Sequence, residues 1–151
     1  MNGATPQASP FSTASRCTTA GLLPHIRPHM EKLAHTNTAE TLFITCTDAR
    51  IVPNAITSSG PGDLFTVRNV GNLVPADQHD YSVEAAIAFA VGRLNVSSIV
   101  VCGHSSCGAM HAALREQGVG GAPRRPGEEH LRSWLKYAQP ALDTFDEGRT
   151  R

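Results

Sequence analysis

The sequence has few charged and few aromatic residues. Charged residues make up 17% of its 151 positions and aromatic residues 5%, and 13 Lys and Arg balance 13 Asp and Glu. Globular proteins average about 25% charged residues. There is no run of basic residues and no interleaving of basic with aromatic residues, which excludes the electrostatic footprint that nucleic-acid binding needs. We therefore expect no nucleic-acid partner.

Long apolar runs are missing as well. The most apolar stretch, residues 99–102, is far shorter than the roughly 18 residues that a membrane-spanning helix needs, so we expect no membrane span. The start of the chain does not follow the pattern of a secretory signal peptide. We therefore expect a cytoplasmic, reducing location. There, the chemistry of free thiolates is a better explanation for the four cysteines than disulfide bonds are.

Several motifs of nucleotide-binding and hydrolytic enzymes do not occur. Neither G-x-G-x-x-G nor a Walker lysine is present. A G-x-S-x-G nucleophile motif begins at Gly103 but has Cys107 in place of its last glycine. The phosphatase loop C-x5-R fails after Cys102 and after Cys107, where Gly108 and Ala113 take the place of the arginine. No C-x-x-C pair is present.

The chain divides into a short N-terminal segment and one domain. Residues 1–20 are rich in Ser, Thr, Ala and Pro, bury too little apolar surface to fold, and are expected to be a disordered tail or linker. Within the domain, residues 21–151, the residue patterns predict strands at 41–46, 64–67 and 98–102, and helices at 24–35, 51–58, 80–94, 107–117 and 128–146. Their alternation predicts an α/β fold with a mainly parallel β-sheet flanked by helices.

Two of the predicted helices carry finer expectations. Asp80 or Ser82 can cap the helix over 80–94, and Val83, Ile87, Val91 and Leu94 are expected on its buried face. Pro140 removes a backbone donor, so the last helix is expected to kink or restart there.

Chemically active residues follow the first and third strands. Cys46, Asp48 and Arg50 come after one, and His104 and Cys107 after the other. Ligands of open parallel sheets bind at the carboxyl ends of the strands, so adjacent strands bring these loops to one pocket. Two thiolates and an imidazole suit tetrahedral zinc with one vacant position. Each short motif alone is weak evidence, because a cysteine at a strand end is often an ordinary core residue.

Taken together, the motifs resemble those of β-class carbonic anhydrases. The matching text is CTDAR at residues 46–50, PGDLFTVRNVGNLVP at 61–75, VEAAIAFA at 83–90 and VVCGHSSCG at 100–108, with a fainter match near Trp134. The resemblance implies a carbonate dehydratase, which hydrates carbon dioxide reversibly to bicarbonate and a proton. It also implies one zinc ion per chain on Cys46, His104 and Cys107, and an active-site dyad of Asp48 and Arg50.

The resemblance assigns further roles. Arg50 keeps Asp48 ionised, and a carboxylate in that state can orient a zinc-bound hydroxide by accepting its hydrogen bond. In some members this aspartate becomes the fourth zinc ligand, which closes the site. Phe65, Val70 and Phe89 match residues that line the apolar substrate pocket. Gly108 opens a helix whose free amide can hold an anionic oxygen and lets the substrate approach closely.

The resemblance also raises alternatives. Family chains usually continue with another helix and a closing strand that carries Gly-Trp and Tyr-Asp, which this sequence does not contain up to Arg151. We therefore expect a C-terminally truncated domain whose sheet lacks an edge strand, and, since unpaired edges favour pairing, a homodimer or higher homo-oligomer. The alternative functions are a non-catalytic zinc-binding regulatory module, and a hydrolase of carbon disulfide or carbonyl sulfide that uses the same site.

Overall fold

The computed structural model describes residues 23–76, 80–116 and 127–149. The predicted tail at residues 1–20 and the last residue of the helix predicted at 107–117 lie outside these ranges. The chain divides into two compact units, Met1–Thr38 and Ala39–Arg151. In the first unit, helix α2 (Leu23–Leu33) matches the helix expected at 24–35. The sheet and all the predicted site residues belong to the second unit.

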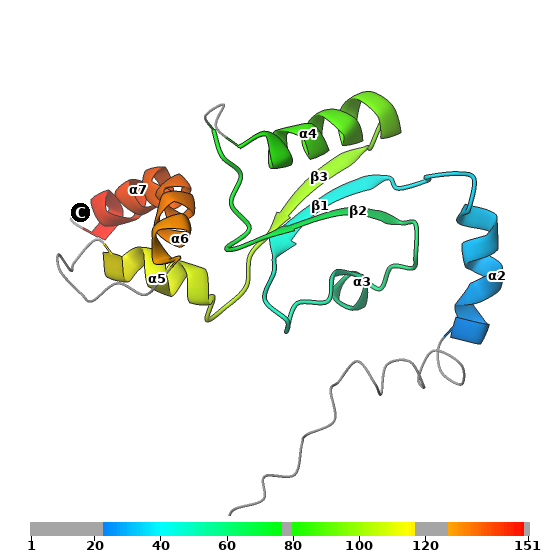
Figure 1. The fold of residues 1–151 in the computed structure, drawn as a ribbon, viewed down its shortest axis with the longest axis horizontal. Helices are drawn as coiled ribbons and strands as arrows, with labels where there is room; N and C mark the ends of the chain where they lie inside the picture. Colours follow the sequence, from blue (N-terminus) through cyan, green and yellow to red (C-terminus); the bar gives the residue numbers. More distant parts are fainter. Residues whose placement is uncertain (1–22, 77–79, 117–126, 150–151) are drawn as a thin grey trace, which may run out of the picture. The chain divides into compact units, whose positions relative to one another are not determined.

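Three parallel strands form the sheet of the second unit (Figure 1). They are β1 (Thr41–Cys46), β2 (Leu64–Asn69) and β3 (Ser98–Cys102), in the order β2-β1-β3. The predicted α/β fold with a parallel sheet flanked by helices is therefore confirmed. As the central strand, β1 is buried from Leu42 to Cys46, which explains its nearly continuous apolar sequence.

The helices of this unit begin and end close to where the sequence predicts. They are α3 (Pro53–Ile56), α4 (Tyr81–Phe89) with a π-helical turn η1 (Ala90–Leu94), α5 (Gly108–Glu116), α6 (Glu128–Leu135), a 3-10 turn η2 (Lys136–Ala138) and α7 (Gln139–Arg149). Helix α3 is shorter than expected. The carboxylate of Asp80 caps α4 by accepting hydrogen bonds from the amides of Ser82 and Val83. The predicted interruption at Pro140 is confirmed, since α7 restarts one residue before it.

One predicted core position on α4 and η1 is wrong. Val91 is 51% exposed, whereas Ala90 is fully buried. A helix turns by about 100° per residue, so Ala90 lies only about 20° from Val83 around the helix axis, while Val91 lies about 80° from Val83. The large apolar residues at intervals of three or four positions favoured Val91 over the small residue Ala90, which packs against β1.

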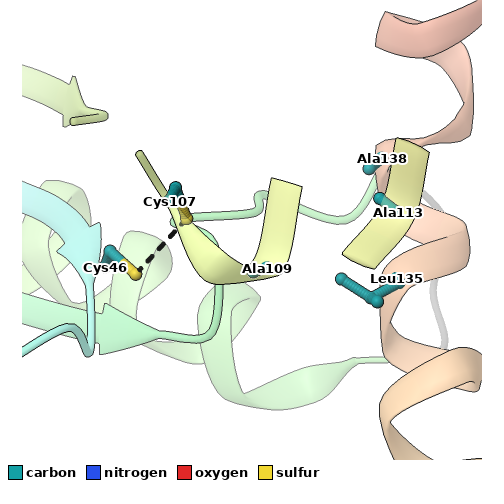
Figure 2. Packing of buried hydrophobic residues seen from close by; sticks show 6 residues of the cluster. All are labelled: Cys46, Cys107, Ala109, Ala113, Leu135 and Ala138. Carbon is teal, nitrogen blue, oxygen red and sulfur yellow. Dashed lines mark hydrogen bonds between the residues drawn. The ribbon is translucent and has the colours of Figure 1, made fainter. Parts of the chain in front are cut away.

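The buried apolar residues of the described ranges form two clusters, and one tryptophan packs against both. Leu42 and Ile44 of β1 pack against Val83 and Ala90 on the helix over 81–94. The second cluster joins the two cysteines near the strand ends to α5, α6 and η2 (Figure 2), and its buried members are Cys46, Cys107, Ala109, Ala113, Leu135 and Ala138. Trp134 packs against both clusters, and its Nε1 donates to the carbonyl oxygen of Val70 at 2.6 Å.

Strand β3 forms one edge of the sheet and is apolar yet exposed. Ile99 and Val101 are 48% and 53% exposed, and among the described residues no further strand pairs with β3. Within the described ranges, no helix combines the length and the apolar character needed to cross a membrane.

Candidate metal centre

The loops after β1 and β3 meet because these strands are neighbours in the sheet. Cys46 ends β1, and His104 and Cys107 lie between β3 and α5. One ligand atom from each of these three residues lies within 4.8 Å of the other two. The sulfur atoms of Cys46 and Cys107 face one another across a gap of 3.9 Å (Figure 2). Both cysteines are buried and neither is in a disulfide.

This spacing fits a single tetrahedral metal ion. With zinc–sulfur bonds of about 2.3 Å and a tetrahedral angle, two coordinating thiolates stand about 3.8 Å apart, close to the distance between these two sulfur atoms. Two sulfur ligands and one imidazole nitrogen are the donor types that zinc prefers, and they leave one coordination position for water or substrate.

His104 is oriented as a metal ligand by its neighbour. Its Nδ1 lies 2.9 Å from the carbonyl oxygen of Ser105, so Nδ1 carries the proton and donates it. The lone pair of Nε2 is then directed at the cysteines. Nε2 is buried and is the one buried side-chain polar atom of the described residues that has no hydrogen-bond partner. A buried nitrogen without a hydrogen-bond partner is expected where that nitrogen binds a metal ion.

The surroundings of Cys46 lower the pKa of its thiol. Burial raises its pKa, but interactions with the His104 side chain and with the backbone of Asp48 and Gly71 outweigh burial and lower the pKa to about 7. The pKa of His104 is raised, mainly by the Cys46 side chain beside it. Each residue of this pair therefore favours the ionised form of the other, and a metal cation bound there would favour the Cys46 thiolate in the same way.

Asp48 and Arg50 form the predicted dyad beside this group. Arg50 donates from Nε to Oδ1 of Asp48 at 2.9 Å and from Nη2 to Oδ2 at 2.7 Å. These hydrogen bonds hold the pKa of Asp48 well below its usual range and raise that of Arg50. Nη2 of Arg50 also donates to the carbonyl oxygen of Ser106 at 3.1 Å, which ties the two loops together. Oδ2 of Asp48 lies 3.9 Å from Nε2 of His104.

The four residues expected around the substrate lie at different distances from this group. Gly108 is the first residue of α5, directly after Cys107, and a Cβ there would meet no described atom within 4 Å apart from its chain neighbours and the backbone of its own helix. Val70 lines a pocket of about 310 Å³ whose other lining residues include Thr47 and Arg68. The rings of Phe65 and Phe89 contact each other, with centroids 5.6 Å apart.

That aromatic pair does not adjoin the cysteines of its own chain. Phe65 pairs in register with Leu42, whereas Cys46 pairs with Asn69, four residues further along both strands. At about 3.3 Å per residue, this separation along the sheet is about 13 Å.

Sequence motifs did not reveal the backbone groups of the site. The carbonyl oxygens of Ser105 and Ser106 and the amide of Gly71 each contact a ligand or the dyad. Every residue type carries these groups, so no residue pattern marks them. The backbone has a positive φ at both Gly71 (83°) and Ser106 (53°). A glycine signals such a conformation in the sequence, whereas a serine does not.

The site and the fold define a class of protein, a parallel α/β domain with a Cys-His-Cys group that could bind a metal ion at the carboxyl ends of its strands. A model of the carbonic anhydrase family matches residues 41–151. The chain therefore belongs to the β-class carbonic anhydrase family. A carbonic anhydrase of Synechococcus elongatus is 47% identical over 117 residues, which are 77% of this chain and 41% of that protein.

Solved structures of the family are similar as well. The β-carbonic anhydrase CcaA aligns with a TM-score of 0.77 at 32% identity, over 91% of this chain and 66% of that one. A tetrameric β-carbonic anhydrase of Sordaria macrospora aligns with a TM-score of 0.71 at 34% identity, with the same two coverages. The chain spans about half the length of the curated relatives that it matches.

Proposed function

We propose that the chain is a zinc-dependent carbonate dehydratase, which converts carbon dioxide and water reversibly to bicarbonate and a proton. The observation that carries this proposal is an ionised carboxylate at the edge of a three-ligand metal group, with Oδ2 of Asp48 3.9 Å from Nε2 of His104. Membership of the carbonic anhydrase family supports it.

Cys46, His104 and Cys107 would hold one zinc ion per chain. When bound, zinc supplies a Lewis acid that brings the pKa of a water molecule close to 7. The hydrogen bonds between Asp48 and Arg50 support the open form of the site, in which Asp48 is kept away from the metal's fourth position.

The residues around that position then have separate tasks. Asp48 is ionised and can only accept hydrogen bonds, so it orients the O–H of the attacking water toward itself and its lone pair toward the substrate. Arg50 keeps Asp48 in that state and in that place. Gly108 is the first residue of α5, so its amide, at the positive end of that helix, would stabilise negative charge that develops on the substrate oxygen.

The apolar part of the substrate pocket is best explained by an assembly. Phe65 lies about 13 Å along the sheet from the level of Cys46 of its own chain, and Phe89 contacts the ring of Phe65. They can line a carbon dioxide pocket where a second copy brings its metal group beside them, with Val70 contributed at the rim. We therefore propose a homodimer or a higher homo-oligomer.

Two features of the surface support self-association. Strand β3 presents an exposed apolar edge, and beside it lies a groove of about 550 Å³ lined by residues that include Val101, Leu114, Leu142 and Phe145. Exposed sheet edges of this kind pair readily. A cytoplasmic location suits the proposal, because a reducing environment keeps Cys46 and Cys107 available as thiolates.

Stopped-flow hydration of carbon dioxide with a pH indicator tests the proposed activity. Zinc-loaded protein is expected to hydrate carbon dioxide faster than buffer, and Cys46→Ser to abolish the difference. Cys102→Ser is the matched control, because Cys102 is a free cysteine that lies outside the three-ligand group. Zinc-loaded protein that is no faster than buffer would reject the proposal and favour the non-catalytic zinc module.

A further inference from the structure

Two functional side chains, Cys46 and Asp48, stand two residues apart and serve the same site. In an extended chain, residues i and i+2 point to the same face. The pairing of β1 with β2 continues one residue beyond β1, because the amide of Thr47 donates to the carbonyl oxygen of Asn69 at 2.9 Å. The C-x-D spacing thus brings a thiolate and a carboxylate to one face only while this segment stays extended.

A single arginine binds the backbone on both sides of Thr47. Nε of Arg68 donates to the carbonyl oxygen of Cys46 at 3.2 Å, and its Nη2 donates to the carbonyl oxygen of Asp48 at 2.9 Å. In an extended segment the carbonyl groups of residues 46 and 48 point in the same direction, and so do their side chains. Whatever holds both carbonyls therefore also fixes the relative direction of the Cys46 and Asp48 side chains.

The guanidinium group is suited to this task. Its Nε and Nη2 donors lie in one rigid plane, so they can bind two oxygens at a fixed separation, which a single ammonium group cannot reproduce. Arg68 itself is on a regular element, where it pairs in register with Thr45 of β1. The guanidinium group of Arg68 is therefore carried by a strand of the sheet rather than by a loop.

The two arginines of the site hold different parts of Asp48. Arg50 binds the carboxylate and the carbonyl oxygen of Ser106. Arg68 binds the backbone before and after Thr47. We propose that Arg68 is a positioning residue, which keeps the segment over 46–48 extended so that the Asp48 carboxylate remains beside the ligand group. This inference rests on the proposed carbonic anhydrase function.

Hydrogen–deuterium exchange followed by mass spectrometry tests, without reference to activity, whether the two hydrogen bonds from Arg68 hold the segment over 46–48. In zinc-loaded protein, Arg68→Lys and Arg68→Gln are expected to accelerate exchange about tenfold in peptides over 46–51, because two hydrogen bonds that stabilise this segment are lost. The amides of Thr47, Arg50 and Ile51 are the reporters, since each is hydrogen-bonded there. Peptides from α4 should exchange as before, and Arg93→Lys, an exposed arginine in η1, should change nothing.

A double-mutant cycle tests the consequence for the reaction. Per bound zinc, Arg68→Lys is expected to lower kcat/KM about tenfold in the wild-type background and less than about twofold in an Asp48→Asn background, since Arg68 acts through Asp48. Equal losses in both backgrounds would overturn the proposal. Unchanged exchange over 46–51, uniformly faster exchange throughout the sheet, or unfolding of both Arg68 variants would overturn it as well. If the wild-type protein hydrates no carbon dioxide, the proposed function fails. The exchange data still decide whether Arg68 positions the segment over 46–48.

Discussion

Replacing one sulfur ligand should weaken zinc binding by two to three orders of magnitude. In Cys46→Ser, a hydroxyl group takes the place of a thiol whose pKa is lowered to about 7, so a readily formed anionic ligand is lost. Four-ligand zinc sites bind with about 10 to 16 kcal/mol at pH 7, so each ligand accounts for roughly 2.5 to 4 kcal/mol. Loss of one ligand therefore raises the Kd for zinc by a factor of about 70 to 900.

Competition with a chromogenic zinc chelator at pH 7 measures this change. Cys102→Ser provides the comparison, because it removes a thiol of the same unit that is not among the three grouped ligands. Cys102→Ser should bind zinc as the wild-type chain does. A Cys46→Ser protein with wild-type affinity, or equal weakening in the two variants, would refute the assignment of Cys46 as a ligand.

Three further predictions concern the dyad and the core. Asp48→Asn should retain zinc, measured by mass spectrometry, but lose about 100-fold in the kcat of hydration, because the amide no longer accepts hydrogen bonds as a carboxylate does. Arg50 lowers the pKa of Asp48 in the folded state. The interaction between Asp48 and Arg50 therefore contributes fully to the free energy of unfolding above the unfolded-state pKa of about 3.9, and this contribution is lost as the pH falls further. Urea midpoints recorded against pH should thus fall less steeply below about pH 4 in Asp48→Asn than in the wild-type chain. Leu42→Ala empties a fully buried site and should cost about 3 to 5 kcal/mol in urea unfolding. Val91→Ala, at an exposed site, should cost at most about 0.5 kcal/mol.

Much of the fold could be predicted because its elements follow local rules. The apolar run TLFITC predicted a strand with the observed bounds of β1, and Asp80, one of the two predicted caps, does cap α4. The sequence could not distinguish Ala90 from Val91 as the contact with the sheet, because burial there depends on helix phase rather than on residue size. It predicted β3 as a strand but did not predict how exposed its apolar side chains are.

The meeting of Cys46, His104 and Cys107 depended on a condition that the residue pattern left open. The carboxyl ends of parallel strands meet only if the strands are neighbours, and the structure shows that β1 and β3 are neighbours. What the motifs left out is the surrounding network. The Ser105 and Ser106 carbonyls that orient His104 and Arg50, and the two carbonyls that Arg68 binds, are backbone groups whose positions appear only in the folded chain.

X-ray absorption at the zinc edge, on the zinc-loaded chain at neutral pH, tests most directly whether these three residues hold one ion. The account predicts two sulfur neighbours at about 2.3 Å and two nitrogen or oxygen neighbours at about 2.0 to 2.1 Å. Cys107→Ser should reduce the sulfur contribution to one neighbour. A first shell without sulfur, or a spectrum that Cys107→Ser leaves unchanged, would contradict it.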